Sequence, residues 1–178
     1  VYSLPSETTF TPSEGKFIDT GIKLFESVDT SKPTWTILYD IDFGSDIQSK
    51  ADTYCAFHCM EETSPWNGLS AAIWAKGSLG LNIYGTANDI SGTKAVAGTR
   101  IKGGLIISES SFSLSSTVSN KGTTNIKNYS GNVDKTLILG AYQTSTGTKG
   151  RFFDGTFHRF KVYNRVLTTE EINTFIAG

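Results

Sequence analysis

Two carboxylates on one predicted strand have the residue types and spacing of a hydrolytic pair. Asp40 and Asp42 lie two positions apart in the alternating segment 35–43, so both project from one face with their Cα atoms about 7 Å apart. Glycosidases use two carboxyl groups about 5 to 9.5 Å apart, one as the acid and the other as the nucleophile or base. Such a pair needs two different pKa values, which require burial or charged neighbours. We expect this face of the strand to be solvated and therefore predict that the pair is not catalytic.

Cys55, His58 and Cys59 form a second cluster, and their side chains are of the types that bind zinc. On one strand the two cysteines would face the same side about 13 Å apart, too far for a disulfide unless the chain turns between them. A zinc site needs four ligands, and the only other histidine is His158. We predict buried free thiols and keep a disulfide and a metal site as the less favoured alternatives.

Aromatic and amide side chains on two adjacent predicted strands have the chemistry of a sugar-binding platform. The apolar residues of segment 79–84 belong to the core, which places Asn82 and Tyr84 on the opposite face. The short turn at 76–78 brings Trp74 alongside them. Apolar walls joined to a few placed donors and acceptors make a binding surface for a small ligand. The alternative is that Trp74 belongs to the core or that a loop covers this face.

The polar loop 142–151 is a further candidate because loops at one rim of a β-sandwich commonly carry function. Tyr142, Gln143 and Arg151 offer an aromatic ring and hydrogen-bonding groups to a sugar or a phosphate-bearing polymer. We predict that these three residues supply further contacts to the platform. The alternative is a solvated loop without a function.

Calcium is a further cofactor for which the sequence offers ligands. Carboxylates are scattered along the chain, without the dense single-segment loop that some calcium sites use. They are Asp19, Asp46, Asp52, Asp89, Asp134 and Asp154. A calcium site assembled from several loops stays open, and no other cofactor is predicted.

Periodicity predicts a series of short strands. The clearest is 35–43, in which every second residue faces the core. These inward residues are Trp35, Ile37, Tyr39, Ile41 and Phe43. Further strands are predicted at 17–22, 53–60, 69–75, 79–84, 101–108, 111–119, 136–141 and 151–163, with polar connections at 85–99 and 120–132.

One helix is predicted near 168–176, at the end of the chain. Thr168 and Glu171 have the spacing of a capping box, which satisfies free backbone N–H groups at a helix start. Leu167 and Ile172 occupy the two positions of a hydrophobic staple. The chain end is therefore expected to pack against the rest of the domain.

Motifs at both ends resemble laminin-G-like jelly-roll domains of the concanavalin A-like class. The C-terminal motifs are Leu139-Gly140-Ala141, Phe153-Asp154-Gly155-Thr156-Phe157 and the segment 162–172 (VYNRVLTTEEI). Segments 17–22 (FIDTGI) and 35–43 (WTILYDIDF) look like the first two strands, in a form common in tail and adhesion proteins of phages of Gram-positive bacteria. The resemblance implies a sandwich in which the concave face of one sheet often carries the ligand, and lectin-like members often bind calcium. Jelly-roll glucanases carry an acid triplet, Glu-x-Asp-x-Glu or Glu-x-Asp-x-x-Glu, and no such run exists here.

The composition argues against several classes of function. The formal net charge is −1, so the chain lacks the basic footprint that binds nucleic acid or an acidic membrane. No run approaches the roughly 18 apolar residues of a membrane helix, so no membrane insertion is expected. The 18 glycines and 4 prolines fit short strands joined by polar turns. At 178 residues, a single domain over 1–178 is the simplest division.

These features predict an all-β, antiparallel two-sheet jelly-roll sandwich of the concanavalin A-like type with a short C-terminal helix. The predicted function is a non-catalytic, lectin-like module that binds a carbohydrate polymer or a cell-surface glycan. We expect it to be part of a larger polypeptide or assembly, extracellular or on a virion surface. A glycoside hydrolase or lyase and a structural or protein-binding spacer domain are the alternatives, because a fold does not fix a function.

Overall fold

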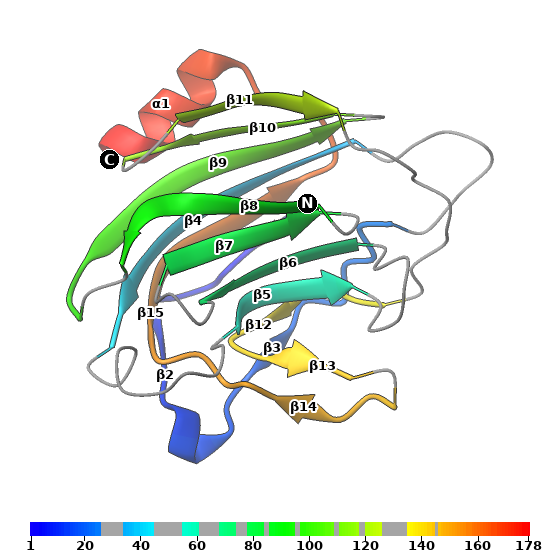
Figure 1. Cartoon of the computed structure of the whole chain (residues 1–178), viewed down its shortest axis with the longest axis vertical. Helices are drawn as coiled ribbons and strands as arrows, with labels where there is room; N and C mark the ends of the chain where they lie inside the picture. The colour runs from blue at the N-terminus through cyan, green and yellow to red at the C-terminus, as the bar shows by residue number, and fades with distance from the viewer. Residues whose placement is uncertain are drawn as a thin grey trace.

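The computed structural model describes the chain except residues 26–33, 45–54, 61–67, 74–77, 84–85, 95–96, 109–110, 118–119, 126–134 and 145. At residues 70, 72–73, 78–83, 86–94, 111–112 and 120–125 it describes the backbone alone. The described chain forms two antiparallel sheets packed face to face, with one helix outside them (Figure 1). The predicted all-β two-sheet sandwich with a short C-terminal helix is confirmed.

The larger sheet has seven strands in the order β1-β15-β4-β9-β10-β11, with β2 also paired to β15. These strands are β1 (Tyr2–Ser3), β2 (Thr8–Phe10), β4 (Trp35–Phe43), β9 (Arg100–Ser108), β10 (Ser111–Ser116), β11 (Asn120–Asn125) and β15 (Gly155–Tyr163). Its central strand β4 lies between β9 and β15, so segments far apart in the sequence meet along it. Charged residues of these three strands therefore become neighbours.

The smaller sheet has six strands in the order β3-β12-β5-β6-β7-β8. They are β3 (Ile18–Asp19), β5 (Cys55–Met60), β6 (Gly68–Ile73), β7 (Ser78–Ile83), β8 (Thr86–Lys94) and β12 (Ile138–Leu139). The remaining elements are a hairpin of β13 (Tyr142–Gln143) and β14 (Lys149–Gly150), a 3-10 helix η1 (Pro12–Glu14) and the helix α1 (Thr169–Ala177). The β13–β14 hairpin lies at the lower end of the sandwich in Figure 1 and contacts β5.

The core lies between the two sheets. The inward residues predicted for β4 are all buried or half-buried in it: Trp35, Ile37, Tyr39, Ile41 and Phe43. Phe160 of β15 packs against Phe57 of the opposite sheet, with ring centroids 5.5 Å apart, and against Phe157 at 5.7 Å. Burying each such side chain contributes about 1.5–3 kcal/mol, so a one-residue slip of β4 would be costly.

The two cysteines behave as small core residues. Cys55 and Cys59 are both buried thiols that form no disulfide, which confirms the prediction for them. Burial raises the pKa of the Cys59 thiol to about 12, so this sulfur stays protonated and inert.

Helix α1 begins at the predicted capping box. The Thr168 hydroxyl accepts the Glu171 backbone N–H at 3.2 Å, and the Glu171 carboxylate accepts the Thr168 N–H at 2.8 Å. Leu167 and Ile172 share a buried cluster with Leu38 of β4. The helix therefore covers part of the outer face of the seven-stranded sheet, and the prediction of a helix near 168–176 is confirmed.

Several predicted boundaries are wrong. The segment 85–99, predicted as a connection, contains β8, and 120–132 contains β11. These two strands end the order of their sheets, where backbone pairing to one neighbour can form a strand without alternating apolar residues. The strands predicted at 151–163 and 136–141 shorten to β15 and β12, because Arg151 and Gly140 have positive φ and interrupt the extended chain.

Candidate functional site

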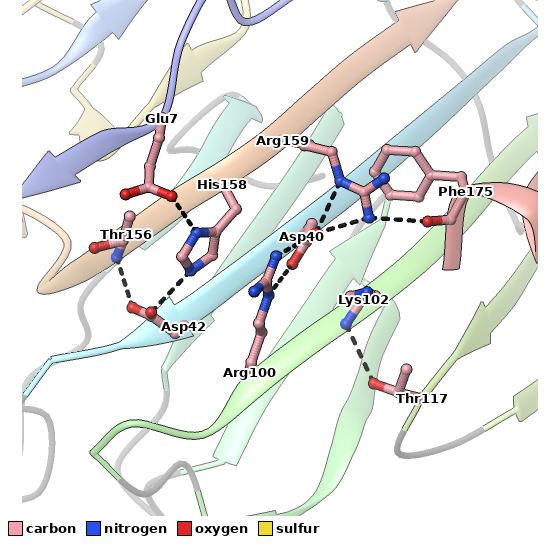
Figure 2. Close-up of polar contacts among 10 residues, drawn as sticks. All are labelled: Glu7, Asp40, Asp42, Arg100, Lys102, Thr117, Thr156, His158, Arg159 and Phe175. Atoms are coloured by element: carbon pink, nitrogen blue, oxygen red, sulfur yellow. Dashed lines mark hydrogen bonds and ion pairs between the residues drawn. The ribbon is translucent and has the colours of Figure 1, made fainter. Parts of the chain in front are cut away.

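A network of charged side chains spans the outer face of the seven-stranded sheet (Figure 2). Asp40 of β4 is fully buried there. Arg100 of β9 holds both of its oxygens, with Nε 2.6 Å from Oδ1 and Nη2 2.9 Å from Oδ2. Arg159 of β15 donates from Nε to Oδ2 at 2.9 Å and from Nη2 to the backbone oxygen of Phe175 at 2.9 Å. The predicted solvated face is therefore wrong for Asp40, because two arginines cover it.

The arginines decide the charge state of Asp40. Burial alone would raise the pKa of its carboxyl group, but the hydrogen bonds and positive charges of Arg100 and Arg159 outweigh burial and lower the pKa. A carboxylate held in the charged form cannot donate a proton as a general acid must. Asp40 acts instead as an anchor that fixes two arginine side chains on the sheet face.

Asp42 is half-exposed and has different partners. Its Oδ1 accepts the backbone N–H of Thr156 at 3.0 Å, and its Oδ2 lies 2.9 Å from Nε2 of His158. The other ring nitrogen of His158 lies 2.5 Å from the carboxylate of Glu7. Burial alone would lower the pKa of His158, but the hydrogen bonds to Asp42 and Glu7 raise it. The imidazolium form can donate to both carboxylates, which ties the chain before β2 to β15.

Sequence reasoning missed Arg100, Arg159 and His158 as partners of the two aspartates. They lie 60, 119 and 116 residues away from the aspartates they bind, and no local pattern links positions so far apart. The only usable signal was the presence of basic residues in or directly before two other predicted strands, without any indication that those strands flank β4.

Part of the predicted sugar platform lies outside the described residues, namely Trp74 and Tyr84. Asn82 is in β7, where it pairs with Ser70 of β6, and Ser70 pairs with His58 of β5. The three positions therefore form one cross-strand row of the six-stranded sheet.

The register of β7 indicates which side of the sheet this row faces. Leu81 pairs with Ala71 and Ile83 pairs with Leu69, and both partners on β6 are buried in the core. Successive positions of a strand face opposite sides, so the position between Leu81 and Ile83 belongs to the outer face. The backbone register thus agrees with the predicted alternation.

The β13–β14 hairpin brings two predicted site residues onto the same outer face. The ring of Tyr142 lies 4.3 Å from that of the buried His58, and the guanidinium carbon of Arg151 lies 4.9 Å from the centre of the Tyr142 ring. Gln143 pairs with Lys149 across the hairpin, and its buried side-chain oxygen accepts no hydrogen bond from the described residues. Tyr142 and Arg151 therefore adjoin the end of the row that contains His58.

Arg151 has an unusual backbone. Its φ is 50°, and no other non-glycine residue among those described has a positive φ. This left-handed conformation costs a residue with a Cβ roughly 1–2 kcal/mol, whereas glycine adopts it freely. The Arg151 carbonyl accepts the Cys55 N–H at 2.9 Å, which holds the backbone against β5. The exposed guanidinium forms no hydrogen bond or ion pair with any residue that the structure describes.

A groove of about 500 Å³ lies between β15 and α1. Lys161 and Tyr163 line it from the strand, and Glu170, Thr174 and Phe175 line it from the helix. Its volume falls within the range of about 300–1,000 Å³ that small-molecule sites occupy. None of the residues predicted to bind sugar lines this groove.

Metal binding is not visible in the described part of the chain. There, no three His, Cys, Asp or Glu side chains gather as a metal ion would require. Of the predicted calcium ligands, Asp46, Asp52 and Asp134 lie outside the described residues and Asp89 is described by its backbone alone. A calcium site therefore stays a prediction. No helix in the described residues is long and apolar enough to cross a bilayer.

Comparison with known proteins identifies the fold. No protein-family model matches the sequence. No curated protein matches it in sequence. Among solved structures, the Ruminococcus gnavus IT-sialidase CBM40 bound to α2,6 sialyllactose is 15% identical with a TM-score of 0.60, and the match covers 96% of this chain and 97% of that one. At this identity the likeness shows the fold alone: a lectin-like β-sandwich of the kind found in sialidase CBM40 modules.

Two whole sialidases match over a part of their length. The NanB sialidase of Streptococcus pneumoniae is 12% identical with a TM-score of 0.64, covering 97% of this chain and 27% of that chain. A mutant Trypanosoma rangeli sialidase is 11% identical with a TM-score of 0.60, covering 82% of this chain and 23% of that chain. The chain thus spans about a quarter of each of these sialidases. The laminin-G-like part of the resemblance stays a prediction.

Proposed function

We propose that this chain is a non-catalytic, lectin-like carbohydrate-binding module that recognises a cell-surface or cell-wall glycan. Support comes from the full-length likeness to a CBM40 module that was solved with α2,3 and with α2,6 sialyllactose. The module would act within a larger polypeptide or assembly, outside the cell or on a virion. Its fold is shared with domains that make up about a quarter of whole sialidases.

The observation that carries the proposal is the exposed Arg151 stacked beside Tyr142. A glycine at this position would remove the backbone strain, so an arginine is favoured there only if its side chain contributes something else. The guanidinium has five N–H donors and lies over the Tyr142 ring, and it donates no hydrogen bond to the described residues. We infer that these donors bind oxygens of a glycan lying on the outer face of the six-stranded sheet.

The remaining predicted residues would extend this site along the sheet. Asn82 lies in the same cross-strand row as His58, so it would reach a ligand bound beside Arg151. Trp74 and Tyr84 would provide stacking surface, and Gln143 a further hydrogen bond. Such a shallow surface predicts weak binding, near 1 mM or about −4 kcal/mol.

A glycan array with the purified chain, including both sialyllactose isomers and bacterial wall polymers, tests the function. Binding to no glycan on the array would overturn the proposal. Trp74→Ala should abolish retention on the bound glycan while the fold persists; an unfolded variant would show that Trp74 belongs to the core.

Arg151→Gly tests whether Arg151 binds the ligand, because a purely structural role would not combine weaker binding with higher stability. We expect binding to fall at least about tenfold, as for a lost charged hydrogen bond, while stability rises by about 0.5–1 kcal/mol because the strain is relieved. Arg151→Gln is the matched control, since it removes the charge and keeps the strained backbone, so it should weaken binding without gaining stability. Unchanged binding in both variants would place the ligand elsewhere.

The proposal that the module is non-catalytic is tested by a hydrolysis assay. The charged state and saturated contacts of Asp40 remove one member of the only carboxylate pair that the sequence singled out. We expect no release of reducing ends from glucans, chitin-like polymers or peptidoglycan. Release by the wild type but not by Asp40→Asn would show that the chain is an enzyme.

A further inference from the structure

The groove between β15 and α1 shares no lining residue with the Arg151 site. Arg159, Lys161 and Tyr163 are alternate residues of β15, so they point to the same outer side of the sheet. Glu170 and Thr174 are one turn apart on α1 and line the facing wall. The groove therefore has one wall from a strand and one from a helix, which the capping box and the staple hold in place.

The base of the groove is apolar. Leu38, Leu167 and Phe175 line it and are buried members of the cluster beneath α1. Tyr163 packs on the same cluster and remains half-exposed, with the Arg165 guanidinium 5.7 Å from the centre of its ring. An apolar base with a partly exposed ring can receive the C–H face of a ligand.

Side chains of both charges line the groove. Arg165 donates to both oxygens of Glu171, at 2.6 and 3.1 Å, and Arg159 is bound to the buried Asp40. Lys161 and Glu170 form no hydrogen bond or ion pair with the described residues. The lining thus has three cations (Arg159, Lys161 and Arg165) and two carboxylates (Glu170 and Glu171), with Arg159 and Arg165 already bound to carboxylates.

Lys161 and Glu170, which have no partner among the described residues, offer complementary hydrogen-bonding groups. The Lys161 ammonium has three N–H donors and no acceptor, and the Glu170 carboxylate accepts hydrogen bonds and has no donor. A hydroxyl group can both donate and accept, so a ligand with several hydroxyl groups satisfies both side chains. Thr174 adds a hydroxyl of its own on the helix wall.

We propose that this groove is a second binding site and that its ligand is a neutral sugar unit. The sugar would place an apolar face against Tyr163 and Phe175, accept hydrogen bonds from Lys161 and donate one to Glu170. This inference rests on the proposed function, since it adds a site to a glycan-binding module. It differs from that function in position and ligand, because Arg151 offers a cation without an acidic partner among the described residues, whereas the groove offers Lys161 together with the carboxylate of Glu170.

NMR titration of the whole chain with lactose, cellobiose, maltose and chitobiose tests the groove directly. At least one of these neutral disaccharides should shift the amide signals around Lys161 and Glu170, with a Kd on the order of 1 mM. The Kd should stay constant between about 0.05 and 0.5 M salt, because a neutral ligand gains nothing from screened charges. Sialyllactose should bind in the groove no more tightly than lactose.

Variants of the two walls make the test specific. Lys161→Met keeps most of the aliphatic stem and removes the donors, so binding should weaken about tenfold. Thr174→Trp should fill the groove and abolish binding. Lys102→Met is the matched control, because Lys102 lies in β9 of the same sheet, opposite Asp40, and does not line the groove. It should bind as the wild type does.

The following outcomes would overturn the inference that the groove binds a neutral sugar. No response to any of the four disaccharides, shifts confined to another surface, or wild-type binding by Lys161→Met and Thr174→Trp would show that the groove does not bind a neutral sugar. A stronger, salt-sensitive response to sialyllactose at the groove would show that its ligand is acidic. Arg151→Gly should leave binding in the groove unchanged, because Arg151 does not line it. If the groove binds no neutral sugar, the array result and the proposed function still stand.

Discussion

Gly104 of β9 lies directly beneath Ile172 of α1. A methyl group placed on Gly104 would come 2.7 Å from Cγ2 of Ile172 and 3.1 Å from Cδ2 of Leu38. Helix α1 therefore packs against the sheet at a position where β9 has no side chain. The preceding glycine, Gly103, faces the core, where a Cβ would collide with the Tyr39 hydroxyl. One pair of adjacent glycines thus makes room on both sides of β9.

Gly104→Ala should destabilise the protein. Strand preference alone favours alanine over glycine by about 0.5–1 kcal/mol, but overpacking against Ile172 costs about 1–3 kcal/mol and decides the sign. The urea midpoint should fall. Gly150→Ala in β14 is the control, because no atom lies within 4 Å of its added methyl group. A Gly104→Ala protein as stable as the wild type would show that α1 has space to move outward.

Local patterns in the sequence predicted the elements that local physics specifies. Alternation over 35–43 fixed the inward face of β4, and the Thr168–Glu171 spacing fixed the start of α1. Both signals span a few residues, and both depend on backbone geometry that repeats everywhere in proteins. The hairpin of β6 and β7 was predictable for the same reason.

Sequence periodicity could not show what covers the outer face of β4. It placed Asp40 opposite the core correctly, yet solvent does not reach that side chain, because Arg100 and Arg159 come from strands distant in sequence. Tyr142 and Arg151 were both predicted to bind the ligand, but their contact with each other could not be predicted. This contact depends on the left-handed backbone of Arg151, which no turn signal in the sequence marks. Burial and long-range charge pairing are properties of the fold, and only the structure shows them.

Asp40→Asn should cost about 1–3 kcal/mol at neutral pH. Removing one partner of a buried ion pair usually costs about 3–5 kcal/mol, but the side chains of Arg100 and Arg159 are 46% and 33% exposed, so water relieves part of their lost pairing. Urea unfolding of the variant and the wild type measures the difference. Asp19→Asn, which changes an exposed carboxylate, is the control and should change stability by less.

The cost of Asp40→Asn should also depend on pH. The pKa of Asp40 is lower in the folded chain than in the unfolded one, so its stabilisation is present above the unfolded value of about 3.9 and is lost as the pH falls through the folded value. The gap between wild type and variant should therefore shrink in acid below about pH 4. A gap that widens in acid would contradict the lowered pKa.

Tyr39→Phe should leave the protein as stable as the wild type or more stable. The Tyr39 hydroxyl is buried and has no hydrogen-bond partner among the described residues. A buried polar group without a partner costs about 1–3 kcal/mol, and phenylalanine keeps the ring without that cost. Tyr2→Phe, at a half-exposed position, should change stability by less than about 0.5 kcal/mol. A loss above about 1 kcal/mol for Tyr39→Phe would reveal a partner for the hydroxyl.

His158→Asn should destabilise the protein more in mild acid than in alkali. The pKa of His158 is raised because the hydrogen bonds to Asp42 and Glu7 outweigh burial and the nearby charge of Arg100, both of which lower it. A raised folded pKa means that the stabilisation is fully present below the unfolded value of about 6.5 and is lost as the pH rises through the folded value. The gap between wild type and His158→Asn should thus be largest near about pH 5.5, where both carboxylates are still charged.

Imidazole titration by NMR measures this pKa directly, and the His158→Asn spectrum identifies its signal against that of His58. Glu7→Gln is the matched partner variant, because Glu7 supplies one of the two carboxylates and is 63% exposed. It should lower the His158 pKa and shrink the stability gap at mild acid, more so at low salt, since screening weakens a partly exposed pair. A His158 pKa below about 6.5 in the folded wild type, or a stability gap that grows with pH, would show that the histidine is held neutral between the two acids.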